Sequence, residues 1–299
     1  MNPSWPIWRS MLFVPSHEEK FVEAAHTRGA DAYILDLEDS VPLAKKSAAR
    51  GSLARAGGLV TRSSAAVVVR INGEPALVGD DLQAAVIPGV AALMVPKVES
   101  GDDVRALDTR IGELERDRQL SPGQMLLIAQ IEHVRALPRL DDIATSSPRL
   151  MGMILGSEDF SMSAGMDPTP ETLYAPNQQM LFACRRAGIL PFGFPGSISV
   201  FRDLDQLRHL IRLAREMGFV GSYAIHPNQV TVMNELFTPS KDELKHARDL
   251  LAGWEAASAQ GRGAFEFRGR MVDPPVVGRA QEVLRRYAAV MRSSGSDKV

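Results

Sequence analysis

The chain has 299 residues, of which 45% are hydrophobic and 23% charged, a composition typical of an ordinary globular protein. Length and composition exclude a disordered tail and a minimal scaffold, and they allow one or two domains with a large core. The formal net charge of -2 gives no electrostatic reason to expect nucleic acid or a membrane surface as a partner. We therefore expect small-molecule partners.

Two features favour a cytoplasmic protein. The single cysteine, Cys184, cannot form a disulfide within the chain, and its helical surroundings make it a poor candidate for a nucleophile. Residues 1–16 contain a short apolar run, but neither a basic leader with a long apolar segment nor the roughly 18 apolar residues of a membrane span. We expect a cytoplasmic location and no contact with membranes.

Short apolar runs rich in β-branched residues recur along the chain. They are continuously apolar, which is typical of strands covered on both faces of a parallel sheet. Amphipathic segments with helical spacing lie between them, for example residues 203–219, where Gly218 ends the helix. The expected strands, in chain order, are residues 10–15, 32–39, 66–72, 92–99, 125–132, 150–159, 189–196 and 221–227.

Eight strands alternating with helices within about 230 residues match the usual size of a (β/α)8 barrel. A doubly wound open sheet is the alternative, but it normally carries a glycine-rich turn after the first strand, which residues 13–21 do not contain. The sequence therefore predicts the α/β class: a (β/α)8 TIM barrel over residues 1–236 with a C-terminal helical extension over residues 237–299. Two further helices, residues 241–260 and 278–291, would make this extension a lid or an oligomer arm.

Ionisable and polar residues collect where the expected strands end. In a barrel of this type these ends converge on one mouth, where the loops that follow the strands build the site. Carboxylates brought so close repel one another and lose hydration, so such a cluster persists most easily where cations neutralise it. The residues concerned are Asp36, Glu38, Asp39, Arg70, Asn72, Lys97, Glu99, Glu132, Glu158 and Asp159.

A divalent metal ion is one such cation. Oxygen ligands without a histidine and cysteine set favour Mg2+, or Mn2+, over zinc. Glu132 and Asp159 are the preferred ligands because they end consecutive strands, so that their carboxylates can meet across one ion. Alternatively, each could pair with Arg70 or Lys97 in a salt-bridge network, and spacing alone does not decide between the two interpretations.

Several motifs occur in one order along the chain: "RSMLFVP", "ADAYILDLEDSVPLAKKSAAR", "VVVRIN", "VPKVE", "IAQIE", "GSEDF", "GFVGSYAIHPNQV" and "GRMVDPP". Together they resemble the HpcH/HpaI aldolase and citrate lyase β-subunit (CitE-like) superfamily, in its acyl-CoA lyase branch, from about Arg9 to the C-terminal helix. The resemblance implies a TIM barrel, Mg2+ and reversible Claisen-type cleavage of a 3-hydroxyacyl-CoA. Such a substrate, like malyl-, citramalyl-, methylmalyl- or citryl-CoA, gives acetyl-CoA or a related thioester and a 2-oxo acid.

The resemblance also implies roles for single residues. Glu132 and Asp159 match the metal ligands of the family, and Arg70 matches its active-site arginine, which would bind substrate. Asp273 matches an aspartate that acts as acid and base from a C-terminal segment reaching a neighbouring subunit, which implies a homo-oligomer, a trimer or hexamer. The positions that resemble the lining of the CoA or substrate pocket are Phe13, Lys20, Ala224 and Ile225.

This chemistry gives the other carboxylates a use, since Glu38 and Asp39 can accept hydrogen bonds from metal-bound waters. Simpler roles compete with it. Arg70 could merely neutralise neighbouring acids, and Asp273, before two prolines, could only cap the last helix. The remaining expectations are that Lys97 forms an ion pair rather than a Schiff base, that His226 is structural, and that Lys20 is a surface lysine unless it binds substrate.

Three departures from the family pattern leave the substrate open: Ser16 in the first strand motif, and His133 and Arg135 after the metal carboxylate. Two other functions stay open as well. One is a metal-dependent aldolase that acts on CoA-free hydroxy-oxo acids. The other is a non-catalytic binding or assembly subunit of the citrate lyase type.

Overall fold

The computed structural model describes residues 5–293, and the chain divides after Phe237 into two compact units. The first unit is built on eight parallel strands in the order β7-β6-β5-β4-β3-β2-β1-β8. The strands are β1 (Ser10–Pro15), β2 (Ala32–Asp36), β3 (Ala66–Arg70), β4 (Val90–Val95), β5 (Leu126–Ile131), β6 (Leu150–Leu155), β7 (Leu190–Phe192) and β8 (Ser222–Ala224).

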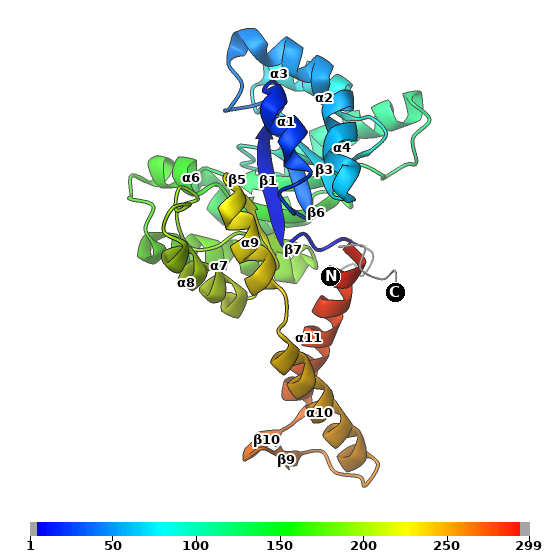
Figure 1. The fold of residues 1–299 in the computed structure, drawn as a ribbon, viewed down its shortest axis with the longest axis vertical. Helices are drawn as coiled ribbons and strands as arrows, with labels where there is room; N and C mark the ends of the chain where they lie inside the picture. The colour runs from blue at the N-terminus through cyan, green and yellow to red at the C-terminus, as the bar shows by residue number, and fades with distance from the viewer. Residues whose placement is uncertain (1–4, 294–299) are drawn as a thin grey trace. The chain divides into compact units, whose positions relative to one another are not determined.

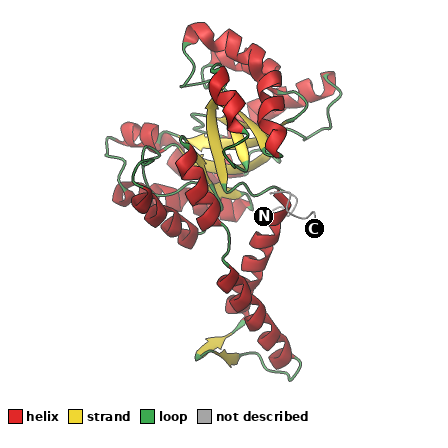
Figure 2. Cartoon of the chain, in the orientation of Figure 1, coloured by secondary structure: helices red, strands yellow, loops and turns green. Residues whose placement is uncertain are grey.

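The two end strands of this order meet and nearly close the sheet into a barrel. Phe192 and Gly221 form a parallel bridge, and the Gly193 N–H donates to the Gly221 carbonyl at 2.9 Å. An open sheet would leave both end strands unpaired, so the predicted (β/α)8 barrel is confirmed. Figures 1 and 2 show the strands enclosed by helices.

Burial explains the continuous apolar runs. Every residue of β2 is buried, because one face of the strand fills the barrel and the other packs under helices. None of the helices within residues 5–293 is both long and apolar enough to cross a membrane. Those of the first unit are α1 (Glu19–Ala25), α2 (Lys46–Val60), α3 (Pro75–Ala85), α4 (Gly101–Asp117), α5 (Leu140–Ala144), α6 (Ser157–Ala164), α7 (Pro170–Ala187), α8 (Leu204–Met217) and α9 (Pro227–Phe237).

The strands end earlier than their apolar runs suggest. β2 stops at Asp36, so Glu38 and Asp39 lie in the loop after it and not in the ladder. Asp36 itself holds that loop, since its carboxylate accepts from the Glu38 N–H at 3.0 Å and from the Ser40 hydroxyl at 2.5 Å. The carboxylates therefore stand at the mouth of the barrel, as the sequence predicts.

The second unit pairs two helices with a hairpin that the sequence interpretation did not include. α10 (Lys241–Ser258) and α11 (Pro274–Ser293) enclose β9 (Phe265–Phe267) and β10 (Arg270–Val272). Arg268 and Gly269 between the strands both have positive φ, at 50° and 76°, as a two-residue hairpin turn requires.

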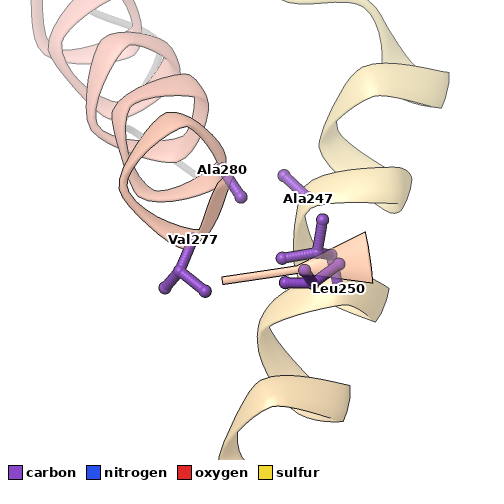
Figure 3. Close-up of a cluster of buried hydrophobic side chains, with 5 residues drawn as sticks. Ala247, Leu250, Val277 and Ala280 are labelled. Atoms are coloured by element: carbon purple, nitrogen blue, oxygen red, sulfur yellow. The ribbon is translucent and has the colours of Figure 1, made fainter. Parts of the chain in front are cut away.

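A small apolar core holds this unit together. Figure 3 shows side chains of α10 and α11 facing each other, and Val272 of β10 completes the cluster with Ala247, Leu250, Val277 and Ala280. α11 begins at Pro274 and not at Gly278 as predicted, because proline is well suited to the first helical turn, where its missing N–H is not needed.

Candidate active site

A cavity of about 490 Å3 opens at the carboxyl ends of the barrel strands. Its lining combines charged and apolar side chains, which suits a ligand with a charged end and a hydrocarbon part. A larger cavity, about 820 Å3, lies in the C-terminal unit, but none of the strand-end carboxylates lines it. The strand-end cavity is lined by Phe13, Pro15, Asp36, Asp39, Ser40, Arg70, Gln130, Gly156, Ser157, Glu158, Asp159, Ile198, Tyr223 and Ile225.

Arg70, at the end of β3, is held by the acids of the β2 loop. Its Nε and Nη2 donate to the two oxygens of Asp36 at 2.7 and 2.8 Å, and its Nη1 lies 3.1 Å from Asp39 Oδ2. Burial disfavours both charges, but this bidentate pair outweighs it, so the pKa of Asp36 is lowered and that of Arg70 is raised. Arg70 is therefore a permanent, rigidly oriented cation, and its guanidinium lies 4.6 Å from the Phe13 ring centroid.

Lys97 joins two further carboxylates. Its Nζ donates to Glu38 Oε1 at 2.9 Å, and its backbone N–H donates to Glu132 Oε2 at 2.8 Å. The hydrogen bond to Glu38 raises the pKa of Lys97, so the amine stays protonated and forms an ion pair, not a Schiff base. Lys97 has a φ of 55°, in the left-handed region that a non-glycine residue adopts only at some cost in strain.

Glu132, directly after β5, is buried with only 4% of its surface exposed. Besides the Lys97 N–H it accepts a hydrogen bond from Gln130 Nε2 at 2.6 Å. Within the described residues no cationic side chain lies within 4 Å of its oxygens. Burial, and then the negative charges of Glu38 and Asp159, raise its pKa to about 8. A cation beside Glu132 would remove this penalty.

The residues around Glu132 fit a divalent ion. Asp159, half-buried on the first turn of α6, lines the cavity close enough for its charge to act on Glu132. Among residues 5–293 no group of three or more histidine, cysteine or acidic side chains forms a metal cage. Mg2+ does not need one, because it typically uses one or two protein carboxylates and completes its octahedron with waters and substrate.

Gly156, between β6 and α6, leaves room for the Glu132 side chain. A Cβ atom at this position would lie 2.5 Å from Glu132 Cγ and 2.8 Å from Oε1, which is impossibly close. The hydrogen bonds from Gln130 Nε2 and the Lys97 N–H orient the two oxygens of the Glu132 carboxylate. Nearby, Gln130 Oε1 is buried without a hydrogen-bond partner, and the Tyr223 hydroxyl donates to the Leu155 carbonyl at 3.2 Å.

Most of the residues proposed from the sequence gather here. Phe13, Arg70, Asp39, Asp159 and Ile225 line the cavity, and a second cavity of about 490 Å3 adjoins it, since Phe13, Pro15 and Ile225 line both. Glu38 and Glu132 are buried and reach the same network through Lys97 and Arg70.

Other proposed residues lie elsewhere. Lys20 is exposed on α1, with its ammonium 4.8 Å from the Phe21 ring centroid, and Ala224 is fully buried in β8. Asp273 lies in the second unit at the start of α11, where its Oδ1 accepts a long hydrogen bond from the Val276 N–H at 3.4 Å. A capping contact is thus present, and it leaves the catalytic role of Asp273 a prediction.

Sequence reasoning missed the uncharged part of the site. Gln130, Ser157, Ile198 and Tyr223 line the cavity without having been proposed. Gln130 stands two residues before Glu132, so the alternation of a strand places both side chains on one face, which is a signal that could have found it. Ser157 and Ser197 both donate to Glu158 Oε1, and they bind the β7–α8 loop to α6.

Known proteins are similar to this chain over most of its length. The chain is 34% identical over 284 residues to the citrate lyase subunit beta of Leuconostoc mesenteroides subsp. cremoris, covering 93% of this chain and 92% of that one. It is 34% identical over 302 residues to an L-malyl-CoA/beta-methylmalyl-CoA lyase of Cereibacter sphaeroides, with 93% and 94% covered.

Among solved structures, the protein CitE from Mycobacterium tuberculosis, in complex with magnesium, acetoacetate and coenzyme A, has a TM-score of 0.72 and 31% identity. The match covers 93% of this chain and 97% of that one. A family model matches residues 9–227, which span the whole barrel from β1 to the start of α9. The chain therefore belongs to the HpcH/HpaI aldolase/citrate lyase family.

Proposed function

We propose that the protein is a Mg2+-dependent acyl-CoA lyase that reversibly cleaves a 3-hydroxyacyl-CoA to acetyl-CoA, or a related thioester, and a 2-oxo acid. One observation carries the proposal. Asp159 and the anchored cation Arg70 line one cavity, and Glu132, whose pKa is raised, is buried directly behind Gln130 and Gly156 of its wall. The chain is similar to a protein crystallised with magnesium, acetoacetate and coenzyme A.

The charge and position of each residue determine the role that we propose for it. Glu132 and Asp159 would hold Mg2+, which supplies Lewis acidity toward substrate oxygens when bound. Arg70 faces the cavity as a fixed cation and would bind the carboxylate of the 2-oxo acid or the enolate oxygen of the thioester, which a lysine holds less rigidly. Glu38 and Asp39 would accept hydrogen bonds from waters of the ion.

The adjoining cavities suit a long ligand. Phe13 and Ile225 stand between them, so a thioester at the carboxylate cluster could extend its CoA arm into the second cavity, along α1 and the start of α9. Lys20 and Ala224 line neither cavity, but they lie on α1 and β8, next to lining residues Phe21 and Ile225, and we propose them as outer parts of the same binding region. The proposed partners are a CoA thioester and a 2-oxo acid.

Asp273 would exchange the proton at the carbon next to the thioester carbonyl. In the proposed enzyme it comes from the C-terminal unit of a neighbouring subunit in a homo-oligomer, a trimer or hexamer. The similarity to the malyl-CoA lyase, which covers 93% of this chain, supports this assignment because it extends beyond the barrel.

The test is a thioester screen by mass spectrometry. Malyl-, citramalyl-, methylmalyl- and citryl-CoA would each be incubated with the protein and Mg2+, and with a chelator in a parallel series. We expect release of a smaller CoA thioester from at least one of them, abolished by the chelator and by Glu132→Gln. The control is Glu113→Gln, because Glu113 is exposed on α4 and away from the cavity. No release from any thioester would contradict the proposal.

Asp273 separates the lyase from a CoA-free aldolase. Asp273→Asn should lower thioester cleavage and leave cleavage of CoA-free hydroxy-oxo acids unchanged. The relative named as a citrate lyase subunit raises a second candidate, a binding subunit without turnover. Calorimetric binding of a thioester without any product in the same sample would favour that candidate.

A further inference from the structure

Gln229, near the start of α9, is fully buried and joins two loops at the mouth of the barrel. Its Nε2 donates to the carbonyls of Ile198 and Val200 at 2.9 and 3.1 Å. Its Oε1 accepts from the N–H groups of Ile225 and His226 at 2.9 and 3.0 Å. The amide therefore uses both of its donors and both lone pairs, and all four bonds go to the backbone of these loops.

Each of the two loops contributes an apolar side chain to the strand-end cavity. Ile198 belongs to the β7–α8 loop and Ile225 to the β8–α9 loop, and both side chains line the cavity. A second contact ties the loops together, since the Phe201 ring stacks on the His226 ring at 5.2 Å between centroids. Strand pairing stops at the short β7 and β8, before these loops begin. Gln229 thus connects two loops of the site that no strand pairing joins.

We infer that Gln229 is a positioning residue that fixes the distance between Ile198 and Ile225 and so determines which substituent the substrate can carry. The inference rests on the proposed function for the identity of the substrate. A buried leucine would fill the space equally well on α9, but it could not hold the carbonyls of one loop and the N–H groups of the other. The four hydrogen bonds from Gln229 hold the two loops at one separation, which fixes the width of the pocket.

The variant Gln229→Glu tests the hydrogen bonds to the two loops separately. A carboxylate still accepts from the N–H groups of Ile225 and His226, while its second oxygen faces the carbonyls of Ile198 and Val200 and repels them. When burial protonates it, the carboxyl group donates one bond where the amide donates two. Gln229→Leu removes all four bonds. The matched control is Gln179→Glu, the same exchange at an exposed position of α7.

Hydrogen exchange measured by mass spectrometry tests the link without any substrate. In Gln229→Glu we expect amides of residues 198–201 to exchange about tenfold faster, because one or both of the hydrogen bonds to their loop are lost. Amides of Ile225 and His226 should keep their protection in this variant and lose it in Gln229→Leu. Unchanged exchange of residues 198–201 in Gln229→Glu would overturn the inference.

The specificity test compares kcat/KM for malyl-CoA and citramalyl-CoA, which differ by one methyl group. We expect the wild-type protein to discriminate between them by about tenfold or more. The ratio should approach one in Gln229→Glu and stay unchanged in Gln179→Glu. A wild-type ratio of one, or equal losses on both thioesters in Gln229→Glu, would show a purely structural role and overturn the inference. If neither thioester is turned over, and methylmalyl-CoA and citryl-CoA are not cleaved either, the proposed function fails, and the exchange experiment still decides whether Gln229 links the loops.

Discussion

Two buried arginines lie at opposite ends of the barrel and differ in how completely they are paired. Arg149 directly precedes β6, and its Nη1 and Nη2 each donate to Glu115 at 2.7 Å, while its Nε contacts Asp108. Glu115 also accepts from the N–H groups of Gly123 and Met125, both at 2.9 Å. This network is closed, because each of its charges has a partner of opposite sign or a hydrogen bond.

Arg70, at the other end, belongs to a network with too many acids. Asp36 and Glu38 both pair with it, yet Glu132 and Asp159 remain without a cation of their own among the described residues. The buried acceptor Gln130 Oε1 has no hydrogen-bond donor, Glu38 Oε2 contacts only Arg70 Nη1, at 3.0 Å and without hydrogen-bond geometry, and a cavity lies beside them. A network in which every charge is paired stabilises the fold. A network with unpaired acids beside a cavity, here called open, is instead typical of a ligand-binding site.

The comparison predicts that Glu132→Gln affects activity far more than stability. We expect kcat/KM to fall about a thousandfold, because the loss of a metal ligand removes several kcal/mol of charge stabilisation. The melting temperature without Mg2+ should not fall, since the exchange relieves repulsion from Glu38 and Asp159. A steady-state assay measures the fall in kcat/KM, calorimetric titration checks that Mg2+ affinity is lost with it, and thermal unfolding measures the melting temperature. A large drop in melting temperature would contradict the distinction between the networks.

Glu115→Gln should do the reverse. Removing one partner of a buried pair costs about 3 kcal/mol of unfolding free energy, and turnover by the folded protein should stay at the wild-type level. Denaturant unfolding measures the first effect and a steady-state assay the second. A loss of turnover in the fully folded variant would break the comparison.

The same pair predicts a pH dependence. Burial favours the protonated form of Glu115, but the hydrogen bonds from Arg149 and the backbone outweigh it, so the pKa of Glu115 is lowered. Its contribution to stability is therefore complete above the unfolded pKa of about 4.3 and is lost as the pH falls through the lowered folded value. The stability difference between the wild-type protein and Glu115→Gln should be constant from pH 6 to 7, by our estimate about 3 kcal/mol, and shrink below about pH 4.

Arg70→Lys tests whether the open network needs the geometry of the arginine or only its charge. Lysine keeps the charge but not the two parallel bonds to Asp36, so we expect kcat/KM to fall about a hundredfold with little change in Mg2+ affinity. Steady-state kinetics and metal titration provide the two values. A variant with full activity would mean that only the charge of Arg70 matters.

Asp39→Asn should have the smallest effect. The Asp39 side chain is 61% exposed and makes one contact to Arg70 at 3.1 Å, so solvent screens its charge. We expect a change in kcat/KM of less than about fivefold. A larger loss in the steady-state assay would place Asp39 in direct contact with the substrate or its ion.

The barrel could be predicted because burial on both faces of each strand leaves continuous apolar runs, and the acids at strand ends could be placed because parallel strands bring those ends together. The hairpin of the second unit could not, since β9 and β10 are three residues each and only partly buried. Nor could Gln229 be found, because its role depends on two loops that only the closed barrel brings beside it.

The left-handed backbone of Lys97 has a consequence for engineering. Glycine adopts this conformation freely, so glycine in place of Lys97 would relieve roughly 1 kcal/mol of backbone strain. The backbone bond to Glu132 would survive that exchange, but the ammonium on buried Glu38 would not. A selection for heat resistance measures only the sum of these two effects, so a gain at this position should be accepted only with a catalytic assay alongside.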